Sequence, residues 1–359
     1  MKIEHYSPTI RRKEMDAVLT AMVEDRIGPG ERSRLLIQTA KEHLHFDYAL
    51  ALRSPATALY LALKALDLKD GDGVLASSLS PRYYAQVFAD LRLTPLYCDV
   101  SFSLPCMSRE TIEKAIAAKP SGVEPRCIAL HHTLGFVPDA ASIAELGIPL
   151  IEDISQSYCP SGSPSADSAQ DASSAEQTEK KLVHGAFAIL GLEERDMLTS
   201  GGGALLFAMN RRDGSVLRNY SNIPPEYCLP DINAALAVTQ FREAAKNMIK
   251  RGEIAQAYTQ ASLRTKHKRF VSLDGVEYNN YAFPLVLETG MKDVSTYARK
   301  KEIIVESAFE QSLAGAGISD SVLCPVSYSL SLRTVLFPLY PRLHSQDAQR
   351  VSRLIMTLP

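Results

Sequence analysis

The sequence lacks the features that would point to a secreted, zinc-binding or membrane protein. Its six cysteines have no Cys-x-x-Cys spacing, so they indicate neither a zinc site nor a disulfide framework, and we expect reduced thiols. No stretch approaches the ~20 apolar residues of a membrane-spanning helix, and the N-terminus has no apolar signal-peptide core. The sequence therefore predicts a soluble, cytoplasmic protein.

Strong charge of either sign is also missing. The net charge of -2 gives no reason to expect a nucleic acid or an anionic membrane as a partner. The basic run at 246–251 is interpreted as a solvated helix face. With 359 residues, 46% hydrophobic and 22% charged, the chain is long enough for a large core and a smaller domain.

The first two-thirds of the chain alternates strand-like and helix-like segments. Such alternation is typical of βαβ units and a mostly parallel sheet, in which ligands bind beyond the carboxyl ends of the strands. The expected strands lie at 49–52, 73–76, 95–100, 126–131, 148–152, 187–190 and 204–209, and the expected helices at 56–66, 83–91, 140–146 and 232–262.

Two domains are predicted. Residues 1–245 form the larger one, and 246–359 form a smaller C-terminal α/β domain with strands at 281–287 and 303–306. Residues 161–181 are interpreted as a mobile insertion, because their serine-rich, low-complexity sequence cannot bury enough apolar surface to offset the entropy of ordering.

An acid and an amide follow one of the buried strands. Asp153 ends the run IED, and Gln156 comes three residues later. A carboxylate can pair with a protonated ring nitrogen, and an amide can bond a ring oxygen, so the pair suits a heteroaromatic cofactor. Taken alone, an acid at this place is more often a cap or turn residue.

Eight segments, in order, resemble the DegT/DnrJ/StrS family of nucleotide-sugar aminotransferases, which are pyridoxal-phosphate (PLP) enzymes of fold type I. They include IGPG at 27–30, IEDISQS at 151–157 and LPDINAALAVTQ at 229–240. The others lie at 54–66, 71–74, 94–100, 132–139 and 338–351. The resemblance implies a mixed, mostly parallel seven-stranded sheet sandwiched by helices, a PLP cofactor, a nucleotide-sugar ligand and a homodimer.

The lysine that the family uses to anchor PLP is missing. Counting back from the glycine run at 201–203 places this position at Arg195, and counting forward from Phe187 places it at Glu193. No other register supplies a lysine, because residues 182–245 contain none, and His184 comes too early to match the histidine of the family's dehydratases. Arginine keeps its proton and does not form a Schiff base.

The positions that hold the rest of the cofactor also differ. In the family a Ser-Gly-Thr loop at a helix N-terminus binds the phosphate, and here Pro55 and Ala56 replace the glycine and the threonine. Ser54 and Thr57 could compensate in part. The remaining altered positions are Ala188 for a serine, Glu226 for an asparagine from the neighbouring subunit, and Pro81 for the aromatic ring that stacks on the cofactor, with Tyr83 and Tyr84 nearby.

Two functions remain open. The first is a fold-type-I homodimer that has lost PLP transamination and acts in ligand binding or regulation. The second is an active PLP- or PMP-dependent sugar aminotransferase or dehydratase with an atypical site. Local acid–base candidates for the second are His131, His132, Asp153 and Glu226, and a histidine at a strand end is more often a packing residue. A role in surface interactions for the serine-rich insertion is a weaker third idea.

Overall fold

The computed structural model describes residues 2–160, 183–276 and 278–359. The predicted insertion at 161–181 lies outside these residues. In the part of the chain that is described, no helix is long and apolar enough to cross a membrane.

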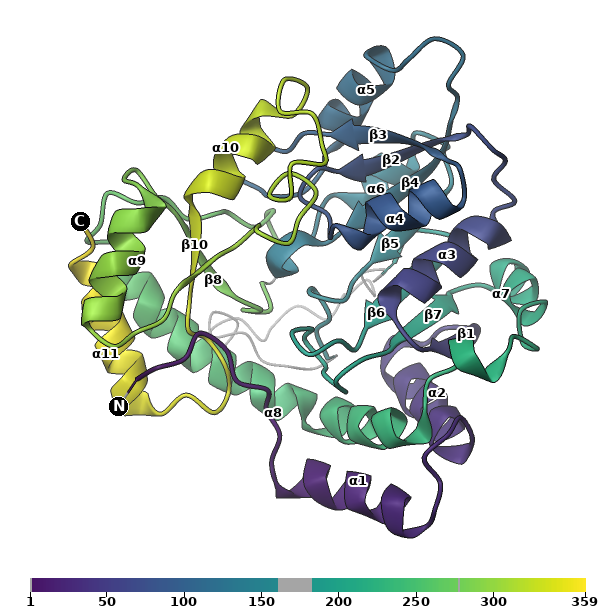
Figure 1. Cartoon of the computed structure of the whole chain (residues 1–359), viewed down its shortest axis with the longest axis horizontal. Helices are drawn as coiled ribbons and strands as arrows, with labels where there is room; N and C mark the ends of the chain where they lie inside the picture. Colours follow the sequence, from purple (N-terminus) through teal and green to yellow (C-terminus); the bar gives the residue numbers. More distant parts are fainter. Residues whose placement is uncertain (1, 161–182, 277) are drawn as a thin grey trace, which may run out of the picture.

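A seven-stranded sheet forms the centre of the molecule (Figure 1), in the order β1-β7-β6-β5-β4-β2-β3. Only β7 runs antiparallel to its neighbours, so the predicted mixed, mostly parallel sheet is confirmed. Its strands are β1 Tyr48–Leu52, β2 Gly73–Ser77, β3 Thr94–Cys98, β4 Pro125–His131, β5 Leu150–Asp153, β6 Phe187–Gly191 and β7 Ala204–Ala208.

Helices cover both faces of this sheet, which explains why its central strands are almost continuously apolar. One face packs against α3 (Pro55–Ala65), α4 (Tyr83–Asp90) and α7 (Arg211–Arg218). The other face packs against α2 (Glu31–Leu44), α5 (Arg109–Ala117), α6 (Ala140–Ala144) and the first half of α8 (Asp231–Ser262). Helix α1 (Arg12–Val23) lies outside this layer, against α8.

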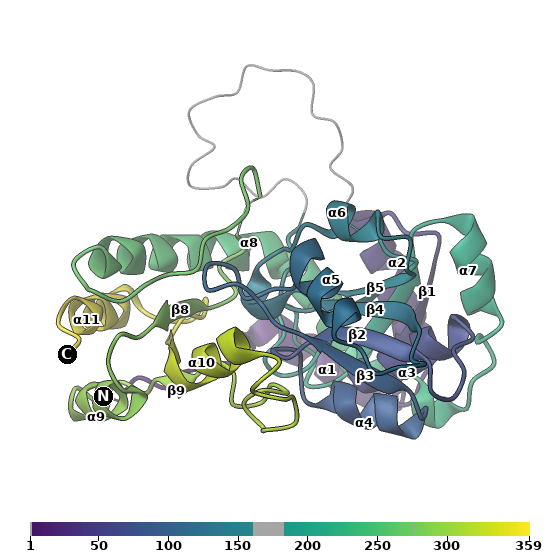
Figure 2. The same ribbon diagram turned by 90° about the horizontal axis from the view of Figure 1, so that it is seen from above.

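A smaller three-stranded sheet follows in the last third of the chain and lies beside the large one (Figure 2). It has the order β8-β10-β9, with β8 at Phe283–Val286, β9 at Glu306–Ser307 and β10 at Thr334–Phe337. Its helices are α9 (Met291–Lys300), α10 (Pro325–Arg333) and α11 (Ser345–Met356). The N-terminal Ile3 packs in the same core cluster as α9 and α11.

Helix α8 connects the two sheets without a break. Its 32 residues run from Asp231 to Ser262, so the boundary expected between 245 and 246 falls inside a continuous helix. The N-terminal half packs on α2, and the C-terminal half carries Ile254, Ala255 and Tyr258 into the core of the smaller sheet. Residues from the large sheet and from the smaller sheet can therefore both contact α8, at different points along the helix.

Candidate active site

Three central strands bring their carboxyl ends to one place. In the sheet register His131 of β4 lies beside Asp153 of β5, and Asp153 lies beside Ile189 of β6. Asp153 is 2% exposed. The acid that the sequence places after a buried strand therefore lies in the interior, at the edge of the sheet where ligands of such folds bind.

Hydrogen bonds from the protein surround the Asp153 carboxylate. Its Oδ2 accepts from the hydroxyls of Tyr83 at 3.1 Å and Tyr84 at 3.0 Å. Its Oδ1 accepts from the backbone N–H of Ser155 at 3.1 Å and from the hydroxyl of the same residue. Because two carboxylate oxygens offer about four acceptor positions, these four donors leave none for a ring nitrogen.

The two tyrosines come from the N-terminal turn of α4, where the sequence predicts a missing stacking ring. Tyr84 is fully buried between Phe88 and His131, and Tyr83 packs on the Tyr84 ring at 5.0 Å between centroids. Burial, and then the Asp153 charge, raises the pKa of both phenols well above the ordinary value. Both hydroxyls therefore stay protonated and act as donors to Asp153.

Gln156 makes a contact that fixes a neighbouring turn. Its Oε1 accepts from the backbone N–H of Leu134 at 2.7 Å, and Leu134 has a left-handed φ of 54° in the turn Thr133–Gly135. The backbone oxygen of Gln156 accepts from the amide of Asn279 at 2.7 Å. The oxygen of this side chain is thus used within the fold.

The anchor positions lie on the loop between β6 and β7. Arg195 is exposed, pairs with Glu306 of β9 at 2.5 Å and lies over the Tyr6 ring at 5.7 Å. Glu193 is half-buried, and burial raises its pKa. Neither residue supplies an amine beside Asp153.

Asp196 is the residue of this loop that sequence reasoning missed. Its Oδ2 accepts from the backbone N–H of Glu193 at 2.8 Å. Burial, and then the charges of Asp153 and Glu193, raises the pKa of Asp196 to about 7. A Cβ at position 191 would clash with the Asp196 carboxylate and lie 2.7 Å from Ser155 Oγ. The absence of a side chain at Gly191 therefore allows the Asp196 carboxylate to pack against the end of β6. The only sequence signal is an acid adjoining the anchor position.

The predicted phosphate cradle begins helix α3. Ser54 is its N-cap and accepts from the Thr57 backbone N–H at 3.1 Å, while the two hydroxyls lie 3.0 Å apart. Pro55 occupies the first helical position, where its fixed φ suits the helix and its missing N–H leaves one donor fewer for an anion. Ala56 follows with no hydroxyl. The residues that could compensate, Ser54 and Thr57, bond each other.

The other altered positions are spread around this site. Pro81 forms a β-bridge with Ser312, which belongs to a C-terminal segment that covers the turn before α4. Ala188 is the second residue of β6 and packs in the core cluster of α2 and α8, on the face opposite α3. Glu226 is exposed on the 3-10 turn Pro225–Tyr227, whose Tyr227 carbonyl accepts from the Arg53 N–H at 2.9 Å.

The two predicted histidines are buried. Burial lowers the pKa of His131 to about 4, and its Nδ1 lies 3.1 Å from Thr133 Oγ1. His132 lies between Ser157, 2.7 Å from its Nδ1, and the fully buried Glu152, 3.4 Å from its Nε2. Glu152 also accepts from the backbone N–H of Gly185 at 2.6 Å. Through these contacts, His132, Ser157 and Glu152 form a buried polar network below the edge of the sheet.

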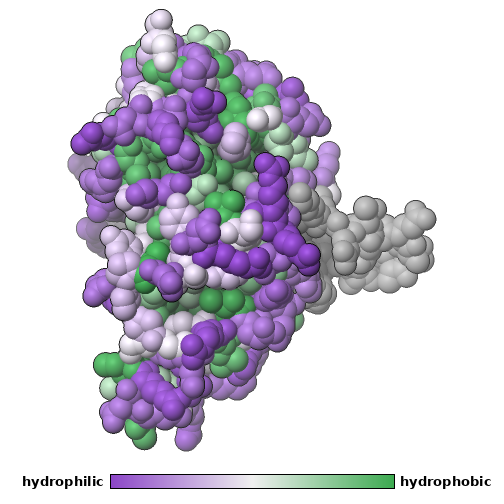
Figure 3. Space-filling view, turned by 90° about the vertical axis from the view of Figure 1, so that its right-hand side faces the viewer, coloured by the Kyte–Doolittle hydropathy of each residue, from purple (hydrophilic) through white to green (hydrophobic). Residues whose placement is uncertain are grey.

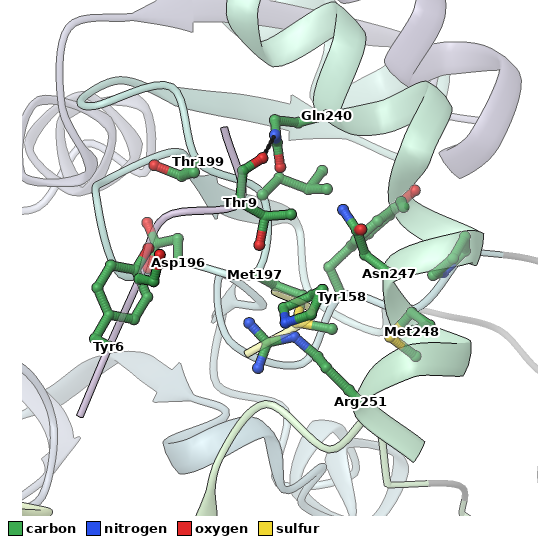
Figure 4. Close-up of a pocket in the computed structure, with 15 residues that line it drawn as sticks. Tyr6, Thr9, Tyr158, Asp196, Met197, Thr199, Gln240, Asn247, Met248 and Arg251 are labelled. Carbon is green, nitrogen blue, oxygen red and sulfur yellow. Dashed lines mark hydrogen bonds between the residues drawn. The ribbon is translucent and has the colours of Figure 1, made fainter. Parts of the chain in front are cut away.

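A cavity of about 20 Å³ lies next to Asp196, between α8, the loop after Asp196 and the N-terminal segment. Figure 4 shows Gln240, Asn247, Met248 and Arg251 reaching it from α8, with Tyr6 and Thr9 on the other side. This space is large enough for about one water-sized guest. It does not include Asp153.

The architecture is that of the fold-type-I PLP-dependent aminotransferases. A putative sugar aminotransferase from Streptococcus pneumoniae in its PMP form superimposes with a TM-score of 0.81 at 15% identity, covering 99% of this chain and 97% of that one. GDP-4-keto-6-deoxymannose-3-dehydratase with bound GDP-perosamine superimposes with a TM-score of 0.79 at 12% identity, covering 98% and 100%. At these identities the likeness shows the fold.

The chain belongs to the DegT/DnrJ/EryC1/StrS aminotransferase family, whose model matches residues 8–161 and 208–356. It is also 23% identical to a putative pyridoxal phosphate-dependent aminotransferase of Bacillus subtilis over 85% of this chain and 80% of that protein. The family resemblance is thereby confirmed. The match omits residues 162–207, which include the loop without a lysine.

The described side chains do not fit the family's cofactor. The Asp153 carboxylate has no acceptor position left, the oxygen of Gln156 is bonded to Leu134, and no lysine lies between 182 and 245. Carboxylates at Glu193 and Asp196 occupy the loop where the anchoring amine is expected.

Proposed function

We propose that this protein is a member of the family that does not carry out PLP transamination and acts instead through ligand binding or regulation. The observation that carries the proposal is the closed hydrogen-bond shell around Asp153, together with the lysine-free stretch 182–245. A pyridinium ring at Asp153 would have to displace Tyr83 and Tyr84. Each displaced bond to a charged group costs about 1.5–3 kcal/mol.

A nucleotide-sugar is the ligand class that we propose for this cleft. Support comes from the family and from a structural neighbour that was solved with bound GDP-perosamine. The cytoplasm is the proposed location.

Homodimerisation is supported by an apolar stripe on α1. Met15, Leu19, Met22 and Val23 follow helical spacing and are all at least half exposed. Figure 3 shows apolar surface at the lower end of the molecule, where α1 lies. We propose that a second copy of the chain covers this stripe, and the family resemblance implies that the Glu226 turn of that copy faces the cleft.

Asp196 supports a second candidate function, an enzyme with an atypical site. A carboxyl group whose pKa is near 7 can both hold and release a proton at neutral pH. Because the charge of Asp153 acts on Asp196, we propose that Asp196 would exchange a proton with a ligand bound at the Asp153 end of the sheet, without PLP.

A thermal-shift panel separates these functions. We expect nucleoside diphosphate sugars to raise the melting temperature of the native protein, and PLP and PMP to leave it unchanged. Stabilisation by PLP alone would refute the proposal. Time-resolved analysis of the sugar in the same samples tests the second candidate, because consumption that is lost in Asp196→Asn would assign an enzymatic role.

A rebuilt variant provides the matched control for the cofactor arm. It combines Tyr83→Phe and Tyr84→Phe with Arg195→Lys, Pro55→Gly, Ala56→Thr and Glu226→Asn. We expect this variant to gain PLP binding that the native chain lacks, since Asp153 regains free acceptor positions and the loop regains an amine. Failure of the rebuilt variant to bind PLP would mean that the altered site is placed wrongly.

A further inference from the structure

The cavity beside α8 contains a buried positive charge, Arg251, for which no ion pair is found among the residues that the structure describes. Arg251 is 7% exposed, and its Nη1 donates to the backbone oxygens of Tyr281 at 2.8 Å and Leu339 at 3.0 Å. Among the described residues, no aspartate or glutamate pairs with this guanidinium, and burial lowers its pKa below the ordinary value. Burying an unbalanced charge is costly, because neutral carbonyls replace only part of its hydration.

Unpartnered polar atoms occur in the same wall. Asn247 is 8% exposed, and its Oδ1 has no hydrogen-bond partner among the described residues. Tyr158 is 1% exposed, and its hydroxyl is likewise without a partner. Both residues line the cavity with Arg251. A rotation of the Asn247 amide by half a turn exchanges the positions of its oxygen and its nitrogen. In the rotated position, Asn247 presents its N–H₂ group to the cavity instead of its oxygen.

The volume of the cavity limits the size of the ligand that can bind in it. About 20 Å³ is room for a single small guest and excludes a sugar or a cofactor ring. In Figure 4 the side chains of Asn247 and Arg251 extend from neighbouring turns of α8 on one side, and Asp196 lies on the opposite side. The positive wall and the carboxyl group are therefore at different ends.

We infer that the cavity is a site for a monovalent anion of halide size, bound between the Arg251 guanidinium and the Asn247 amide. Such an ion balances the buried charge and occupies the space that neutral groups leave open. It joins α8 to the N-terminal segment at Tyr6 and Thr9 and to Pro341, which line the same cavity. Its effect is on stability and does not depend on whether the cleft at Asp153 binds PLP.

Thermal unfolding in chloride and in gluconate at equal ionic strength tests this inference. Chloride at ten times its dissociation constant should raise the melting temperature by about 2 °C. Asn247→Leu should lose this rise. Tyr258→Phe serves as the matched control, because Tyr258 is a buried residue of the same helix that donates to the Pro338 oxygen, and this variant should keep the rise.

Crystals grown in bromide give a second readout on the native protein. An anomalous peak between Asn247 and Arg251 is the expected result. A melting temperature that is equal in the two salts, or a bromide map without a peak in the cavity, would overturn the inference and assign the space to water. The bromide map decides the question even where Asn247→Leu does not fold.

Discussion

Removing one hydroxyl from the shell around Asp153 should reveal how much that shell contributes to stability. In Tyr84→Phe the ring keeps its contacts with Phe88 and His131, and the 3.0 Å bond to Asp153 Oδ2 is lost. A hydrogen bond to a buried charged group contributes about 1.5–3 kcal/mol. We therefore expect the free energy of unfolding to fall by about 2 kcal/mol, or the melting temperature by about 3 °C for a chain of this length.

The assay is urea unfolding of Tyr84→Phe, Tyr83→Phe and the double variant in chloride-free buffer. Because both hydroxyls bond the same oxygen, the double variant should lose less than the sum of the two single losses. Tyr158→Phe is the matched control, since it removes a buried hydroxyl that has no partner among the described residues, and it should cost little. A loss in Tyr84→Phe equal to that of the control would refute the role of the tyrosines.

Three further predictions follow from other parts of the structure. Because the pKa of Asp196 is raised in the folded state, ionisation of this carboxyl group should destabilise the fold increasingly as the pH rises from about 4 to about 7. In urea unfolding at pH 8, Asp196→Asn should therefore be more stable than the native protein by about 2 kcal/mol. At pH 4 the variant should show no such gain. A gain independent of pH would contradict this assignment. Leu19→Glu should shift the chain from dimer to monomer in sedimentation at micromolar concentration, whereas Thr20→Glu on the same helix should not, and a native chain that is already monomeric would remove the proposed interface. Glu152→Gln should cost about 3 kcal/mol of unfolding free energy, because it weakens the buried bonds to His132, His184 and Gly185, and a loss below 1 kcal/mol would show that this network is dispensable.

The sequence was sufficient for the central sheet because its strands are buried on both faces. Short apolar runs such as those of β4 and β6 have few alternative structures besides a buried strand, and the helices between the strands are amphipathic. Helices α1 and α2 were not predicted, since their polar composition weakens the helical pattern. The expected strand at 303–306 is limited to Glu306–Ser307, with Ile303 forming a separate bridge to Ile3.

The candidate site could be located from the sequence but not its hydrogen bonds. The position of Asp153 follows from an acid after a buried strand. Its pairing with Tyr83 and Tyr84 depends on how α4 packs over β5, across about 70 residues of chain, which no local pattern reveals. The approach of Asp196 depends on the absence of a side chain at Gly191, and the burial of Ala188 depends on which face of β6 it lies on.

The central claim is that this chain has the family fold without the covalent cofactor chemistry. The most direct test is the absorbance spectrum of the purified protein with excess PLP, followed by borohydride reduction and peptide mapping. We predict the spectrum of free PLP and no modified lysine. An internal-aldimine band that borohydride abolishes, with the reduced adduct mapped to one lysine of this chain, would contradict the account.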